Sequence, residues 1–141
     1  MSDSNREKLT VAEAVSRLDS IVKDVEAKGR SDAHLKAILV ETILIIDAWN
    51  SRGQVIVDKK MEWLRKAVQH KQGRLGSIHS LLLRAAFGKG GVDSRKTGGW
   101  GKACENLAAR MVRKKIKVGK MTVEAEFMKF GIEQARRNEF D

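Results

Sequence analysis

The complete absence of proline is the feature that most constrains this chain. At average usage, a chain of 141 residues would contain roughly seven prolines. Proline interrupts helices because it lacks a backbone N–H and clashes with the preceding turn. Strand-forming aromatic residues are also scarce, with no Tyr present. We therefore predict an all-α fold, a single compact bundle of about five or six helices that forms one domain over residues 1–141.

Apolar residues recur with helical spacing in the first third of the chain. From Val11 to Ala27 they fall at i, i+3, i+4 and i+7. Thr10 and Glu13 form a capping-box pattern at the start of this helix. A second helix is expected from Ser31 or Asp32 to Trp49. Its apolar residues cover more than one face, which predicts that it is the most buried helix.

Four further helices are expected in the rest of the chain. Residues 54–57 are interpreted as a connector, with Asp58 as the cap of the third helix. The expected elements are a helix from Asp58 to about Lys71, a short helix from Ile78 to Phe87 opened by Ser77, a helix from about Trp100 to Ile116, and a last helix capped by Thr122 with Gly131 as a break.

Residues 88–99 are predicted to be a flexible, glycine-rich, basic loop, because five of these twelve residues are glycine. Lys96 and Thr97 stand at the spacing from Gly90 that a phosphate-binding P-loop requires. However, Arg95 replaces the second glycine, and a helix rather than a strand precedes the loop. The pattern therefore argues against nucleotide hydrolysis.

Positive charge is concentrated in a basic block at residues 59–120. The block holds 17 Lys/Arg and 3 Asp/Glu, whereas residues 1–58 and 121–141 each carry a net charge of −2. Such a block is typical of proteins that bind an anionic polymer. The alternative is a solvated surface that only keeps the protein in solution.

The predicted helix from Trp100 to Ile116 places its cations on one face and its apolar residues on another. Lys and Arg can contact phosphates, while Arg and Asn can also read base edges in a major groove. Salt bridges to the acidic first helix are the alternative for this face. Together with the loop cations, the predicted nucleic-acid-binding residues are Lys89, Arg95, Lys96, Lys102, Asn106, Arg110, Arg113, Lys114 and Lys117.

Catalysis is not expected, because the basic block contains only Glu62, Asp93 and Glu105 as carboxylates. The three histidines, His34, His70 and His79, lack metal-ligand spacing, so no metal or other cofactor is expected. His70 and His79 are predicted to lie near phosphate or solvent. Cys104 falls on the apolar face of its helix and is predicted to be a buried thiol.

Two tryptophans flank the basic block and could stack on unpaired bases. The helix positions of Trp63 and Trp100 favour core packing instead. The start of the chain is polar, without the apolar segment of a signal peptide, and the most apolar stretch, 37–49, is too short to span a bilayer. We therefore expect a soluble cytoplasmic protein that does not bind membranes.

The sequence as a whole predicts a non-enzymatic regulatory or accessory protein that binds nucleic acid, DNA in preference to RNA. The alternative is an adaptor or inhibitor that docks its basic surface on an acidic protein partner. Both hypotheses depend on the positive charge of the basic block, so the sequence does not decide between nucleic acid and an acidic protein as the partner.

Overall fold

The computed structural model describes residues 3–28, 32–67, 77–87 and 94–140, and the chain is mainly helical in these ranges. No strand occurs in these ranges. The predicted all-α bundle of about five or six helices is therefore confirmed. Its elements are a 3-10 helix, η1 (Asp3–Lys8), and the α-helices α1 (Val11–Lys28), α2 (Asp32–Asn50), α3 (Gln54–Ala67), α4 (Ile78–Phe87), α5 (Ser94–Arg113) and α6 (Lys120–Arg136).

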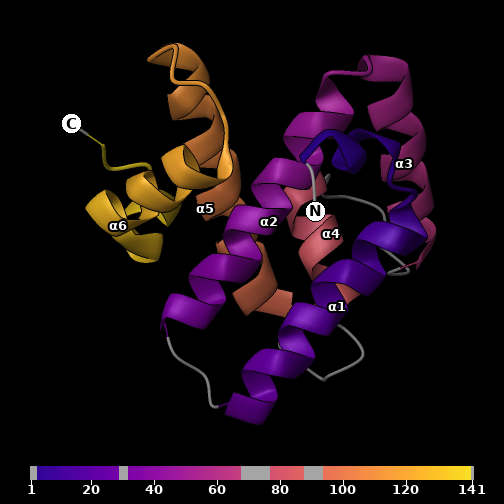
Figure 1. The fold of residues 1–141 in the computed structure, drawn as a ribbon, viewed down its shortest axis with the longest axis horizontal. Coiled ribbons are helices and arrows are strands. Elements are labelled where there is room, and N and C mark those ends of the chain that lie inside the picture. The colour runs from indigo at the N-terminus through magenta and orange to yellow at the C-terminus, as the bar shows by residue number, and fades with distance from the viewer. Residues whose placement is uncertain (1–2, 29–31, 68–76, 88–93, 141) are drawn as a thin grey trace.

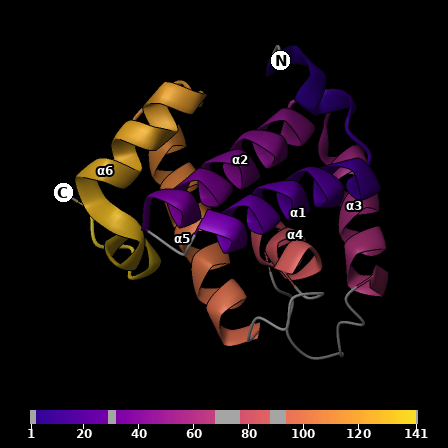
Figure 2. The same cartoon turned by 60° about the horizontal axis from the view of Figure 1, so that its bottom comes forward.

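Helix α2 is the centre of the bundle, and it packs against every other element named above. Figures 1 and 2 show it running through the middle, with α6 on one side and α3 on the other. All nine residues from Ile38 to Ile46 are buried. The prediction that this helix is the most buried is confirmed, because apolar side chains cover its whole circumference.

Glu41 is the only charged residue within that buried run, and two arginines surround it. The Nε and one terminal nitrogen of Arg6 donate to its two carboxylate oxygens at 3.0 and 2.9 Å. Arg17 Nε lies 2.9 Å from the first of these oxygens. A buried carboxylate needs such partners, because removal from water strongly disfavours its ionised form. The cluster therefore fixes η1 and α1 onto α2.

Local signals predicted the starts of α1, α2 and α4 well. Glu13 N donates to Thr10 Oγ1 at 3.1 Å, and Thr10 N donates to Glu13 Oε1 at 3.0 Å, which is the expected capping box. Ser77 caps α4 by accepting a hydrogen bond from the N–H of Ser80. In both cases a side-chain oxygen satisfies an N–H that the first turn leaves without a partner.

Helices α3, α5 and α6 all begin earlier than predicted. Residues 54–57 are the first turn of α3 rather than a connector, and Asp58 accepts a hydrogen bond from Gln54 inside that helix. Burial of Val57 outweighs the weak helix propensity of the β-branched residues there. Thr122 lies at the third position of α6, where its Oγ1 accepts from the N–H of the N-cap residue, Gly119.

Helix α5 extends into the predicted loop, because residues 94–99 are its first six residues. The prediction of a loop over 88–99 is wrong for this half, and residues 88–93 lie outside the described residues. Thr97 is buried, and the rings of Trp100 and Phe87 lie 5.1 Å apart between centroids. Packing against α4 thus overcomes the low helix propensity of Gly98 and Gly99.

Glycine at position 101 permits the close approach of α4 and α5. A Cβ added there would lie 2.5 Å from the Cα of Ser80, well inside van der Waals contact. Farther along the chain, Gly131 adopts φ 79° and ψ 163° and kinks α6. The predicted break at Gly131 is therefore confirmed, although the helix continues beyond it to Arg136.

Two glycines three residues apart on α5 provide a matched test of this packing. Gly98→Ala should raise the free energy of unfolding by about 0.5–1 kcal/mol, because no atom lies within 4 Å of the added Cβ. Gly101→Ala should lower it by about 1–3 kcal/mol through the clash with Ser80. Urea denaturation of both variants measures the two changes. Equal effects of the two substitutions would contradict the observed packing of α4 on α5.

Candidate nucleic-acid interface

Asn106, predicted to read base edges, is buried against the end of α6. Its side-chain amide donates to the backbone oxygen of Ala135 at 2.9 Å and to that of Arg136 at 3.2 Å. These carbonyls belong to the last turn of α6, where regular helical N–H partners run out, and Ala135 O also accepts from the N–H of Asn138 at 3.0 Å. Asn106 therefore caps a neighbouring helix, and the prediction that it lies on an exposed polar face is wrong.

Arg110 is also buried on the predicted binding face, with 5% of its surface exposed. Its Nε lies 3.6 Å from the carboxylate of Glu126 on α6. Its guanidinium carbon lies 4.7 Å from the ring centroid of Phe130 and 5.5 Å from that of Phe140. These contacts combine ion pairing with cation–π attraction. Arg110 thus holds α6 and the C-terminal segment against α5, and it is not an exposed phosphate contact.

Helix α5 ends at Arg113, three residues earlier than predicted, in a Schellman motif. Lys115 adopts the left-handed conformation with φ 57°. Its N–H donates to Val112 O at 3.2 Å, and the N–H of Ile116 donates to Met111 O at 2.9 Å. Lys114 and Lys117 therefore lie in the connection after the helix and not on a helix face.

The end of α5 and the start of α6 together form the largest gathering of exposed cations that the structure describes in one short segment. Five of the eight residues from 113 to 120 are Lys or Arg, and all five are exposed. None of them forms an ion pair with a described carboxylate. We call this set the cationic turn. It consists of Arg113, Lys114, Lys115, Lys117 and Lys120.

The remaining predicted site residues do not join the cationic turn. Lys96 is exposed in the first turns of α5, at the opposite end of that helix. Lys102 is exposed, and its Nζ lies 3.9 Å from Glu105. Arg95 belongs to α5 by its backbone, but its side chain lies outside the described part of the chain, as does the whole of Lys89.

Sequence reasoning missed Lys115 and Lys120. It extended α5 to Ile116, which placed Lys115 away from the cationic face. The density of cations between residues 113 and 120 was the available signal. Helical periodicity concealed that signal, because it sorted neighbouring cations onto different faces.

His79 is buried in α4, and the prediction that it lies near phosphate or solvent is wrong. Burial lowers the pKa of this histidine to about 4. His70 lies outside the described residues. Cys104 is fully buried, as predicted, and its Sγ donates to Leu39 O at 3.7 Å. Burial raises the pKa of this thiol far above its usual value, which keeps it protonated.

The two tryptophans differ in exposure. Trp100 packs on Phe87, as expected for a core residue. Trp63 is 46% exposed, so the core position favoured for it by sequence is wrong. It borders a shallow hollow of about 300 Å³ with Ile56 and Lys59. Helix α3 lies across α2 from α6 (Figure 1), so Trp63 is not part of the cationic turn.

No group of three or more His, Cys, Asp or Glu side chains within the described ranges is arranged to hold a metal ion. Among the helices described above, none has the length and apolar character needed to cross a membrane. Comparisons with protein-family models, curated proteins and solved structures found no match to this chain.

The buried His79 should make stability depend on pH below neutrality. Its folded pKa of about 4 lies below the ordinary value of 6.5, so the unfolded chain binds a proton first as pH falls. Stability should therefore decrease between pH 6.5 and 4, by up to about 1.4 kcal/mol per pH unit, and level off for this group below pH 4. Urea denaturation of wild type and His79→Leu across this range measures the effect. Parallel pH profiles for the two proteins would show that His79 titrates normally.

Proposed function

We propose that this protein binds the backbone of nucleic acid through the cationic turn, and that it prefers duplex DNA to RNA. The single observation that carries the proposal is the exposure of five cations within eight residues, none paired with a described carboxylate. Neighbouring cations repel one another, and phosphates relieve that repulsion. Two of the five also stand where folding alone disfavours them.

Lys115 is the first of these two. It occupies the left-handed position of a Schellman motif, where glycine is the usual residue. The same motif ends α6, and there Asn138 takes the left-handed position with φ 59°. Asparagine tolerates this conformation, whereas for a lysine it costs about 1–2 kcal/mol because of steric clash. Helix termination therefore does not explain a lysine at position 115, whereas a contact with phosphate does.

Lys120 is the second. It is the first residue of α6, where the partial positive charge of the helix dipole disfavours a cation. Arg113 and Lys114 carry less weight, because they lie near the C-terminal end of α5 and its dipole favours them there. The argument for binding thus depends most on Lys115 and Lys120.

The cationic turn is suited to phosphates rather than to bases. Asn106 and Arg110, which could have read base edges, are held inside the bundle. Residues 113–120 include no aromatic ring on which an unpaired base could stack. We therefore propose an accessory role with little sequence preference, and binding without catalysis.

Lys115→Gly should separate binding from stability. It removes the steric penalty of the left-handed lysine, so the free energy of unfolding should rise by about 0.5–1 kcal/mol. It also removes one phosphate contact, so the slope of log K against log salt should flatten by about 0.9. Urea denaturation and a DNA-binding salt series measure the two effects. A stabilised variant with unchanged DNA affinity would exclude Lys115 from the interface.

A larger substitution tests the whole turn. With five phosphate contacts, wild-type protein should bind duplex DNA with a salt slope of about −4.5. The variant with Gln at 113, 114, 115 and 117 should flatten that slope by about 3 to 4 units. The matched control replaces four exposed lysines elsewhere, Lys8, Lys23, Lys59 and Lys66, and so has the same net charge. Equal loss in both variants would indicate attraction by net charge alone.

An acidic protein partner is the second candidate, and two exposed apolar residues favour it. Val112 is 72% exposed and Met121 is 85% exposed, and they flank the cationic turn. Exposed apolar side chains beside a charged patch are common at protein interfaces. Replacing both by Gln should leave DNA affinity unchanged. If wild-type protein retains neither duplex DNA, single-stranded DNA nor structured RNA at low salt, the adaptor function replaces nucleic-acid binding.

A further inference from the structure

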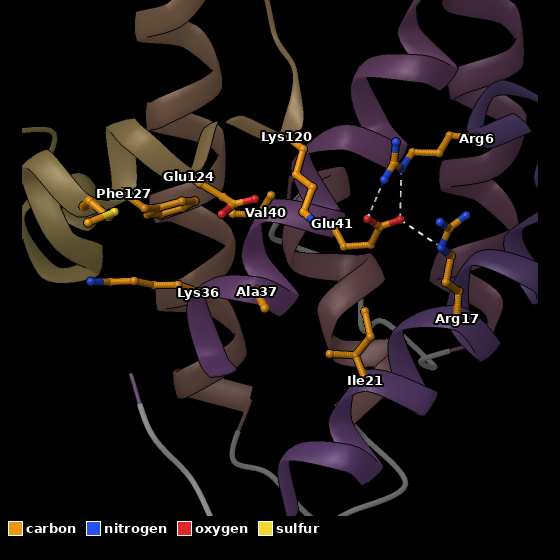
Figure 3. Close-up of a pocket in the computed structure, with 11 residues that line it drawn as sticks. Arg6, Arg17, Ile21, Lys36, Ala37, Val40, Glu41, Lys120, Glu124 and Phe127 are labelled. Atoms are coloured by element: carbon orange, nitrogen blue, oxygen red, sulfur yellow. Dashed lines mark hydrogen bonds and ion pairs between the residues drawn. The ribbon is translucent and has the colours of Figure 1, made fainter. Parts of the chain in front are cut away.

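A groove of about 640 Å³ lies between α6 on one side and α1 and α2 on the other. Figure 3 shows side chains from α1, α2 and α6 converging on it, with the Arg6–Glu41–Arg17 cluster at one edge. Small-molecule sites in proteins occupy about 300–1,000 Å³. The groove is therefore large enough to hold a ligand rather than a few waters.

The charges around this groove are unbalanced. Four cations line it, Arg6, Arg17, Lys36 and Lys120, against the carboxylates of Glu41 and Glu124. Glu41 is already paired with both arginines, so that cluster retains one positive charge. Among the described residues, neither lysine lies within ion-pair distance of a carboxylate. The groove thus presents excess positive charge.

The wall of the groove is apolar. Ile21 comes from α1, Val40 from α2, and Phe127 and Met128 from α6. Met128 lines the groove and is 80% exposed, so it is not part of the core. Ala37 also lines the groove, and its small side chain leaves room at that point. A ligand that fits must cover apolar surface as well as neutralise charge.

From this combination we propose that the groove binds a small amphipathic anion, with one phosphate or carboxylate head and an apolar chain. In Figure 3 Lys120 extends toward Glu41, and Arg17 lies on the other side of that carboxylate, whereas the amine of Lys36 points away from both. The head group therefore lies beside Lys120 and the Arg6–Glu41–Arg17 cluster. The chain lies against Phe127 and its apolar neighbours. A nucleic-acid backbone does not suit this site, because its sugars and phosphates would leave the apolar wall uncovered.

Calorimetric titration of the whole protein tests the proposal without any nucleic acid. The probes are octyl phosphate, octanoate, octan-1-ol and inorganic phosphate, each below its aggregation concentration. Both octyl anions should bind with a stoichiometry of one. Octan-1-ol and inorganic phosphate should each bind at least about tenfold more weakly, because octan-1-ol lacks the charged head group and inorganic phosphate lacks the apolar chain.

Two pairs of variants locate the binding. Ala37→Phe should fill the groove and abolish binding of octyl phosphate, whereas Ala109→Phe, at an exposed position of α5, should not. Lys120→Gln should weaken binding about three- to tenfold, and Lys59→Gln on α3 should not. Circular dichroism of each variant verifies that the helices are intact.

Three results would overturn the proposal. One is binding of octan-1-ol as tight as that of octyl phosphate, which would make the cations irrelevant. Another is octyl phosphate binding that survives Ala37→Phe, which would place it elsewhere. The third is absence of binding at millimolar concentration, which would leave a peptide segment as the occupant to test. Lys120 belongs to both the groove and the cationic turn, but Arg113, Lys114, Lys115 and Lys117 do not line the groove. The DNA-binding test on those four residues is therefore independent of these results, so the two proposals fail separately.

Discussion

Burial of the central part of α2, residues 38–46, is the constraint on which the rest of the structure depends. Every other described element packs on this helix, so its register decides where each of them lies. A buried stretch of helix tolerates a charge only when partners surround it, and Glu41 is paired with Arg6 and Arg17. Loss of one partner from a buried ion pair typically costs about 3–5 kcal/mol. The same cluster borders the groove, so the central packing of the fold also supplies the excess charge of the candidate ligand site.

Local physical chemistry made most of the fold predictable. The helical spacing of apolar residues and the capping side chains predicted the start of α1 at Val11 and both ends of α4 correctly. Both signals are local, because they do not depend on residues distant in the sequence. The errors fall where tertiary packing opposes local propensity. The glycine-rich start of α5 is helical because Trp100 and Gly101 pack against α4. A sequence window holds no information on such a neighbour, so propensity alone predicted a loop.

The candidate site was predicted less well, for a related reason. Sequence reveals that a side chain is charged or polar, but not whether a partner from another helix already satisfies it. Arg110 meets Glu126, and Asn106 meets the backbone oxygen of Ala135, across 16 and 29 residues of chain. Periodicity on α5 placed both with the exposed cations. Because α5 ends at Arg113, most of the exposed cations of the cationic turn lie in the connection that follows the helix.

The pairing of exposed charges elsewhere argues against a merely solvated surface at the cationic turn. On the helix surfaces, Lys23 pairs with Asp19, Lys66 with Glu62, Lys102 with Glu105, and Arg136 with Glu133. Each pair uses the i, i+3 or i, i+4 spacing that relieves like-charge repulsion. The cations of the cationic turn form no such pair with a described carboxylate, although Glu124 stands four residues after Lys120. Lys115 and Lys120 are also kept where backbone conformation and helix dipole oppose them. Lys8, Lys59 and Lys96 are also exposed without an ion pair to a described carboxylate, but they are separated along the chain and do not form a cluster. Violations of local preference that gather in one segment are typical of functional sites, and this supports the proposed role of the cationic turn.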